Sequence, residues 1–251
     1  MNTARLFATS LLVGLVACSS SGNSGSAAGT PGTSSGNTPP DNGGLEGEGE
    51  GTAGSAPDTN PAGVAYPTEN IGTTARKGTT PGNRIANYKF LGFPNGDTAG
   101  GLKPMSLAQY FDPTGSKYEV IHIQAAGVWC SACRGETTTV VPLKPELEAR
   151  KVVWLVSLAE GASPGSPSTE KDLKGWIAQF DSPYSHVIDP ANKNLGVFYD
   201  RTALPWNADI DARTMEILTS GTGGAPNKEV LLGEIDKALE LAKKSTLRTA
   251  K

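Results

Sequence analysis

The sequence predicts a single α/β domain in which helices cover a mixed central sheet. Two nearly continuous apolar runs, residues 118–126 and 151–158, have the composition of strands that are buried on both faces. Helical periodicity follows at residues 134–150, 169–180 and 227–244. Strands and helices that alternate in this way form one sheet covered by helices.

The shorter elements are predicted from local signals. Thr169 and Asp172 have the spacing of a capping pair, and Asp189-Pro190 is typical of a helix start, here of a helix running towards Phe198. Pro142 and Pro145 should kink or restart the helix over 134–150. The remaining expected elements are strands at 86–93, 186–188, 204–211 and 216–218 and a helical turn at 106–111.

Residues 1–18 have the features of a bacterial lipoprotein signal. Arg5 precedes an apolar run from Leu6 to Ala17 that is too short to span a bilayer. The run ends in a sequence that resembles a lipobox, which would make Cys18 the lipid-bearing cysteine of the mature protein. An ordinary secretory signal cleaved near Ala17 is the alternative. Because Ser19 stands where an inner-membrane retention aspartate would stand, an outer-membrane anchor facing the periplasm is favoured.

Composition divides the rest of the chain. Residues 19–85 are rich in Gly, Ser, Thr and Pro, and we expect a disordered tether, although 64–84 should run over the domain surface. Residues 86–245 are expected to form the domain and 246–251 a disordered tail. The formal net charge of −3 gives no basic surface for nucleic acid.

Cys130 and Cys133 are separated by two residues and lie where the first apolar strand gives way to a helix. A helix N-terminus carries unpaired N–H groups and partial positive charge, which lowers the pKa of a cysteine there to between about 3.5 and 7.5. The pair therefore has the pattern of a redox-active dithiol. Half of a zinc site and a permanent structural disulfide are the alternatives. Four zinc ligands are hard to assemble, because His122 and His186 lie inside predicted strands and are expected to be core histidines.

The order of elements, with Trp129-Cys130-x-x-Cys133 after a central strand and Pro205 before a hairpin, resembles the thioredoxin fold. It resembles more narrowly the TlpA-like, lipid-anchored periplasmic thiol–disulfide oxidoreductases. The resemblance implies a thioredoxin-like three-layer α/β/α fold with a mixed central sheet and an N-terminal hairpin extension. It also implies exchange of a Cys130–Cys133 disulfide with partner proteins.

Site residues follow from matching positions in that family. Cys130 matches the attacking thiol, Cys133 the resolving thiol, and Pro205 a proline with a cis peptide bond beside the disulfide. Glu136 matches an acid that some members use to manage protons, although a helix-start acid is an equal interpretation. Gln124 takes the place of a buried aspartate of cytosolic thioredoxins and cannot titrate.

Substrate contacts are expected from Trp129 and Leu204, and from Trp206, which is either a platform for a partner peptide or a core residue. Ala132 and Leu204 depart from the residues that many members carry at these positions. Protein thiols or disulfides of the cell envelope are the expected substrates, and the expected state is a monomer without metal or cofactor. A copper metallochaperone of the same fold and a redox-inert module on a lipoprotein stalk are the other candidate functions.

Overall fold

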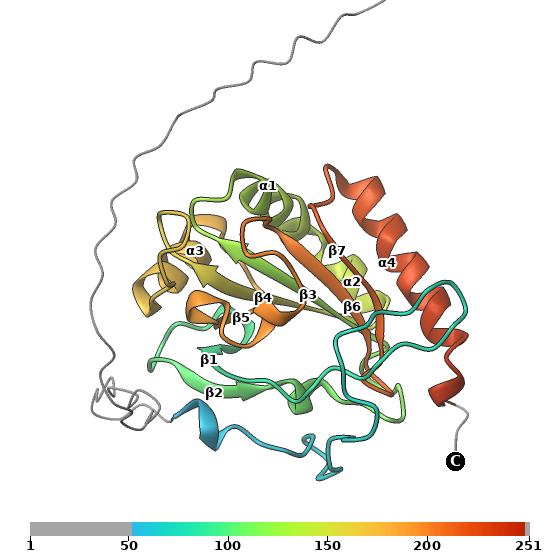
Figure 1. The fold of residues 1–251 in the computed structure, drawn as a ribbon. Coiled ribbons are helices and arrows are strands. Elements are labelled where there is room, and N and C mark those ends of the chain that lie inside the picture. Colours follow the sequence, from blue (N-terminus) through green and yellow to red (C-terminus); the bar gives the residue numbers. More distant parts are fainter. Residues whose placement is uncertain (1–51, 249–251) are drawn as a thin grey trace, which may run out of the picture. The chain divides into compact units, whose positions relative to one another are not determined.

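A computed structural model of the chain describes residues 52–248, which form a seven-stranded sheet with the strand order β2-β1-β5-β4-β3-β6-β7 (Figure 1). Strands β3, β4 and β5 are parallel, and β1, β2, β6 and β7 make antiparallel pairs. The sheet is therefore mixed, and β1 with β2 forms the predicted N-terminal hairpin of a thioredoxin-like fold. The strands are β1 Lys89–Phe93, β2 Lys103–Ser106, β3 Val120–Gly127, β4 Val152–Glu160, β5 Ser185–Ile188, β6 Trp206–Asp211 and β7 Ile217–Thr222. The helices of the described residues are α1 Ser131–Val140, α2 Lys144–Ala149, α3 Glu170–Phe180 and α4 Lys228–Lys243.

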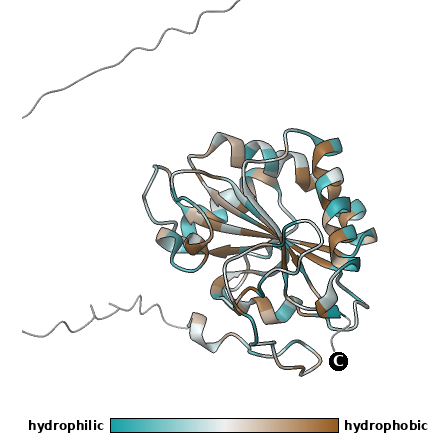
Figure 2. Ribbon diagram, turned by 45° about the vertical axis from the view of Figure 1, so that its right-hand side comes forward, coloured by the Kyte–Doolittle hydropathy of each residue, from teal (hydrophilic) through white to brown (hydrophobic). Residues whose placement is uncertain are grey.

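The described α-helices all pack on one face of the sheet. The chain moves from β3 to β4 to β5 in one direction across the sheet, so right-handed crossovers place α1, α2 and α3 on the same face. Trp154, Val156 and Leu158 of β4 point to the helices, and Leu155 points to the opposite core. In Figure 2 the helices carry both hydrophobic and hydrophilic residues, and their buried apolar side chains belong to the same core as Trp154. The third layer of the predicted sandwich is built from 3₁₀ turns and extended chain.

Three 3₁₀ turns contribute to that opposite layer, and two of them stand where a helix was predicted. Asp189-Pro190 starts no α-helix: the chain forms only the turns Pro190–Asn192 and Leu195–Val197. Ala191 and Asn192 both adopt φ of 56°, which is incompatible with a continuing right-handed helix. The third turn, Leu107–Tyr110, lies where a helical turn was predicted.

The helix predicted over 134–150 is divided at its prolines, as expected. α1 ends at Val140, the turn Val141–Leu143 contains Pro142, and α2 restarts with Pro145 in its first turn. The predicted cap of α3 is confirmed, because Thr169 and Asp172 exchange hydrogen bonds as a capping box.

Residues 52–88, here named the N-terminal strap, lie against the domain, although 52–85 fell within the predicted tether. Tyr66 and Ile85 are buried in the core opposite the helices, and the Tyr66 hydroxyl donates to the Ile85 carbonyl over 2.6 Å. The guanidinium of Arg76 makes a bidentate pair with Glu216 and donates to the Leu241 carbonyl. These contacts offset the conformational entropy that is lost when the segment becomes ordered, although its composition alone suggested disorder.

The C-terminal tail also begins later than predicted. Residues 246–248 form a 3₁₀ turn, and Arg248 pairs with Asp211 and Glu119 at 2.8 and 2.9 Å. The predicted signal segment, Cys18 and the tether before residue 52 lie outside the described residues. Within residues 52–248, none of the helices has the length and apolar character needed to cross a bilayer.

Candidate active site

Cys130 and Cys133 form a disulfide at the start of α1, with 5.3 Å between their Cα atoms. Cys130 is the N-cap residue, and its Sγ accepts a hydrogen bond of 3.0 Å from the main-chain N–H of Cys133. Cys133 is fully enclosed, whereas Cys130 retains 2 % exposure and Ser131 and Ala132 between them are exposed. The cysteine at the helix N-terminus is therefore the one that retains contact with solvent.

The turn that presents the disulfide depends on Gly127 at the end of β3. A Cβ on Gly127 would lie 2.9 Å from the indole nitrogen of Trp129, so a larger residue would push that ring away. Trp129 Nε1 instead donates to Glu160 Oε2 over 2.6 Å. Glu160, a buried acid at the end of β4, was missed from the sequence because its role depends on a partner 31 residues away.

Glu136 lies on the buried side of α1 and is 3 % exposed. Its carboxylate accepts hydrogen bonds from the side chains of Gln124 and Asn207 and from the N–H of Ala225, at 2.7 to 3.0 Å. Gln124 Nε2 also approaches the Cys133 carbonyl at 3.4 Å. The acid is thus held inside the protein and connected to Cys133 through one amide.

Pro205 lies beside Glu136 and follows a cis peptide bond. Gly224 lies between them: a Cβ at that position would be 3.2 Å from both Glu136 Cβ and Pro205 Cγ. The N–H of Gly223 donates to the Pro205 carbonyl over 2.8 Å, which fastens this loop to the end of β7. The fold therefore brings Glu136 and Pro205 together across 69 positions of sequence.

The three residues expected to contact a substrate have different environments. Trp129 and Leu204 are half-buried and lie near each other around Gly127. Trp206 is instead buried, with its ring stacked at 5.3 Å on both Phe198 and Tyr199. Trp206 is a core residue, so the platform interpretation does not fit this structure.

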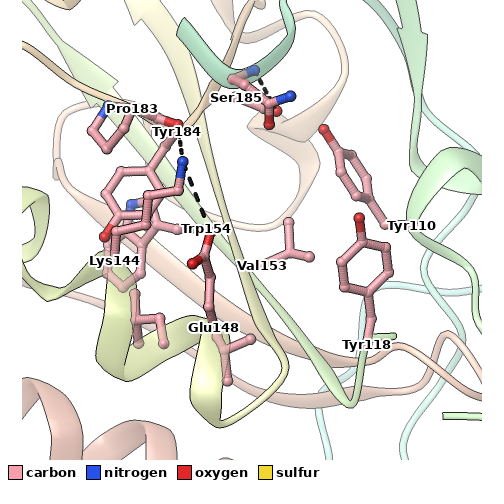
Figure 3. Close-up of a pocket in the computed structure, with 12 residues that line it drawn as sticks. Tyr110, Tyr118, Lys144, Glu148, Val153, Trp154, Pro183, Tyr184 and Ser185 are labelled. Atoms are coloured by element: carbon pink, nitrogen blue, oxygen red, sulfur yellow. Dashed lines mark hydrogen bonds and ion pairs between the residues drawn. The ribbon is translucent and has the colours of Figure 1, made fainter. Parts of the chain in front are cut away.

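A cavity of about 380 Å³ opens next to Trp129. Glu160 and Asn192 line its polar part, and Arg201 lies at its edge with an exposed side chain. A second pocket, of about 120 Å³, lies at the amino-terminal end of β4, where Lys144 contacts Glu148 and the Pro183 carbonyl (Figure 3). Neither cysteine lines this second pocket.

The two histidines differ in their environments. His186 is buried, its Nδ1 lies 2.8 Å from the Tyr184 carbonyl, and its Nε2 has no partner in the described residues. Burial therefore lowers the pKa of His186 to about 4, and the ring is neutral. His122 is hydrogen-bonded at both ring nitrogens, to Asp209 and to Asn207. This polar cluster was not predicted, and its signal was the run of polar residues at every second position of two buried strands.

No group of three or more His, Cys, Asp and Glu side chains within residues 52–248 is arranged to hold a metal ion.

The sequence matches no protein-family model and no curated protein. Among solved structures, the chain is similar to the thioredoxin domain of a thiol–disulfide oxidoreductase from Bacteroides vulgatus, with 16 % identity, 63 % of this chain and 97 % of that one covered, and a TM-score of 0.47.

It is also similar to a DsbF homologue from Corynebacterium diphtheriae, with 14 % identity, coverage of 68 % and 97 %, and a TM-score of 0.48. For AhpC from Enterococcus faecalis the values are 11 % identity, 65 % and 94 % coverage, and a TM-score of 0.49. In this chain the Cys130–Cys133 disulfide lies at the N-terminus of a helix that follows a central strand of a mixed sheet.

Proposed function

We propose that this protein is a thiol–disulfide oxidoreductase that exchanges its Cys130–Cys133 disulfide with cysteines of partner proteins. The observation that carries the proposal is the position of the disulfide: Cys130 caps α1, and its sulfur accepts the N–H of Cys133. A thiolate formed at Cys130 would be stabilised by this hydrogen bond and by the helix dipole. The same features would make Cys130 a good leaving group when a second substrate thiolate attacks the substrate sulfur of the mixed disulfide.

The chemistry runs in either direction through one mixed disulfide. In reduction of a substrate, the Cys130 thiolate attacks a substrate sulfur and displaces the other as a thiolate. The Cys133 thiolate then attacks Cys130, which releases the second substrate thiolate and forms the Cys130–Cys133 disulfide. Two electrons pass from the dithiol to the substrate, and the released thiolates take up protons from solvent.

A partner would approach on the side of Trp129 and Leu204. Among the described residues, the main chain of Leu204 takes part in no hydrogen bond, so it is free to pair with an extended segment of a partner. The cavity beside Trp129 would take an apolar side chain of that segment. Pro205 sets the shape of the Leu204 main chain that the partner would contact. Glu136 is buried next to Pro205 and acts on Cys133 through Gln124.

The proposed activity is tested by the reduction of insulin with dithiothreitol. We expect the full chain at catalytic concentration to shorten the lag before insulin precipitates, because each cycle regenerates the dithiol. The protein carrying both Cys130→Ser and Cys133→Ser is the control. A wild-type lag equal to that of this control would contradict the proposal.

We place the activity in the bacterial cell envelope, on a chain anchored through lipid at Cys18. The support is the sequence alone: the apolar run that ends at Ala17 and the small residues around Cys18. We expect Cys18→Ala to move the protein from the membrane fraction to the soluble envelope fraction. Unchanged membrane association of Cys18→Ala would contradict lipidation, and fractionation by membrane density would distinguish the favoured outer membrane from the inner one.

A further inference from the structure

A row of polar and aromatic side chains crosses the sheet behind the disulfide. In register, His122 of β3 lies between Trp154 of β4 and Asp209 of β6, and Asp209 lies beside Thr219 of β7. Asn207, two residues before Asp209 on the same strand, pairs in register with Gln124. The row therefore extends across the sheet to Gln124 and Asn207, whose side chains donate hydrogen bonds to Glu136.

The hydrogen bonds of Asn207 fix the direction of its amide. Its Nδ2 is 3.0 Å from both carboxylate oxygens of Glu136 and 3.0 Å from the Gly223 carbonyl, all of which only accept. The nitrogen must therefore point to these oxygens, and Oδ1 must point to His122. Asn207 Oδ1 lies 3.1 Å from His122 Nε2, so this ring nitrogen must carry a proton.

The other ring nitrogen of His122 also faces an acceptor. Nδ1 lies 2.9 Å from Asp209 Oδ1, and the second oxygen of Asp209 accepts the Thr219 hydroxyl. An imidazole is more basic than an aspartate, so the shared proton belongs to the ring. A histidine that donates from both nitrogens is an imidazolium.

The surroundings of the ring stabilise this charge. Trp154 stacks on His122 with 3.8 Å between ring centroids and an interplanar angle of 18°, which presents a π-face to the cation. Figure 3 shows the same Trp154 beside Tyr184, and the two ring centroids are 6.3 Å apart. Burial lowers the pKa of His122, but the charges and hydrogen bonds of Asp209, Glu136 and Asn207 outweigh this, and the net direction is upward.

Solvent reaches this row through a cavity of about 220 Å³ that is separate from the one beside Trp129. His122, Asn207 and Asp209 line its floor, and α4 contributes Glu234 and Lys237 at its rim. With Glu136 from α1, these are the charged groups that face His122 from the elements packed around it. Protons can therefore exchange with His122 without passing the disulfide.

We infer that His122 is a positioning residue for the redox reaction: as an imidazolium it orients Asn207 towards Glu136 and supplies the positive charge behind that carboxylate, so that its protonation is coupled to reduction of the Cys130–Cys133 disulfide. The inference rests on the proposed redox function. Reduction by an external thiol such as dithiothreitol breaks the Cys130–Cys133 bond and transfers two electrons to the protein. The two cysteine sulfurs are then thiolate or thiol according to pH. Negative charge on these sulfurs favours the imidazolium, and by linkage the imidazolium favours reduction.

The test uses the full chain with Cys18→Ser, so that Cys130 and Cys133 are its only thiols, and imidazole nitrogen NMR. The chain has two histidines, and neutral His186 is an internal reference. We expect His122 to be protonated on both nitrogens at pH 7 in the oxidised protein. We also expect its titration midpoint to lie at higher pH in the dithiol form than in the disulfide form, because negative charge on the reduced sulfurs favours the imidazolium. A neutral His122 ring at pH 7, or equal midpoints in the two forms, would overturn the inference.

The reduction potential against glutathione between pH 5 and pH 9 gives the second readout. We expect the plot of potential against pH to change slope between the two His122 midpoints. This change should be lost in His122→Gln and kept in His186→Gln, a matched substitution of the other buried histidine. A profile of His122→Gln that superimposes on the wild type would contradict the inference. Neither readout requires turnover of a protein substrate, so the coupling and the proposed function can fail separately, and the NMR arm needs no variant of the row to fold.

Discussion

Cys130→Ser is expected to lower the rate of catalysed insulin reduction by about three orders of magnitude or more, to the level of dithiothreitol alone. Cys130 at the helix cap is the only residue of the pair with exposed surface, and Cys133 is enclosed. A serine hydroxyl in its place cannot form the mixed disulfide through which both directions of exchange pass. Removal of a nucleophile usually costs the greater part of the catalysed rate.

The control for this loss is Ser131→Ala. Ser131 is exposed and lies between the two cysteines, so its substitution perturbs the same turn but removes no reacting atom. We expect its turnover rate to stay within about twofold of wild type. Retention of more than a tenth of the wild-type rate by Cys130→Ser would contradict the assigned role of Cys130.

Glu216→Gln is expected to lower the free energy of unfolding by about 3–5 kcal/mol, the usual effect of breaking a buried ion pair from one side. Both side chains of the Arg76–Glu216 pair are fully enclosed, at 0 % exposure. Glu216 also accepts the Gly82 N–H and the Ser245 hydroxyl, so it fastens the N-terminal strap and the end of α4 to β7. Its neutralisation leaves the guanidinium of Arg76 buried without a counter-charge.

Urea unfolding followed by circular dichroism measures this effect, and Asp236→Asn is the matched control. Asp236 pairs with Arg150 at 2.8 Å, but the two side chains are 55 % and 31 % exposed. Such exposed pairs contribute about 0–1 kcal/mol. Equal, small losses of unfolding free energy in Glu216→Gln and Asp236→Asn would contradict the structural role of the strap.

The sequence predicted the sheet and its helices because their signals are local. The apolar runs of β3 and β4, the capping box at Thr169 and the prolines after α1 each act within a few residues. The packing of residues 52–85 depends on partners such as Glu216, more than a hundred positions away. Composition could not reveal those partners, and the polar, turn-rich strap was therefore assigned to the tether.

The sequence predicted the part of the site that lies within one short motif. Cys130 and Cys133 are close in sequence, and the place of Pro205 followed from a family resemblance. The row through His122 arises from the register of β3 with β6, which joins residues 87 positions apart. His122 looked like a core histidine because its immediate neighbours in the strand, Ile121 and Ile123, are apolar, and only the partners at both ring nitrogens indicate its charge.

The most direct test of the account is the trapping of the mixed disulfide. In a chain with Cys18→Ser and Cys133→Ser, Cys130 is the only thiol, and a bound substrate cannot be released by a second cysteine. Incubation with a disulfide-bonded protein and mass spectrometry of the product should show an adduct on Cys130 that dithiothreitol removes. The corresponding chain with Cys18→Ser and Cys130→Ser should remain unmodified. An adduct on Cys133 in that chain, with Cys130 unmodified in the first, would contradict the account.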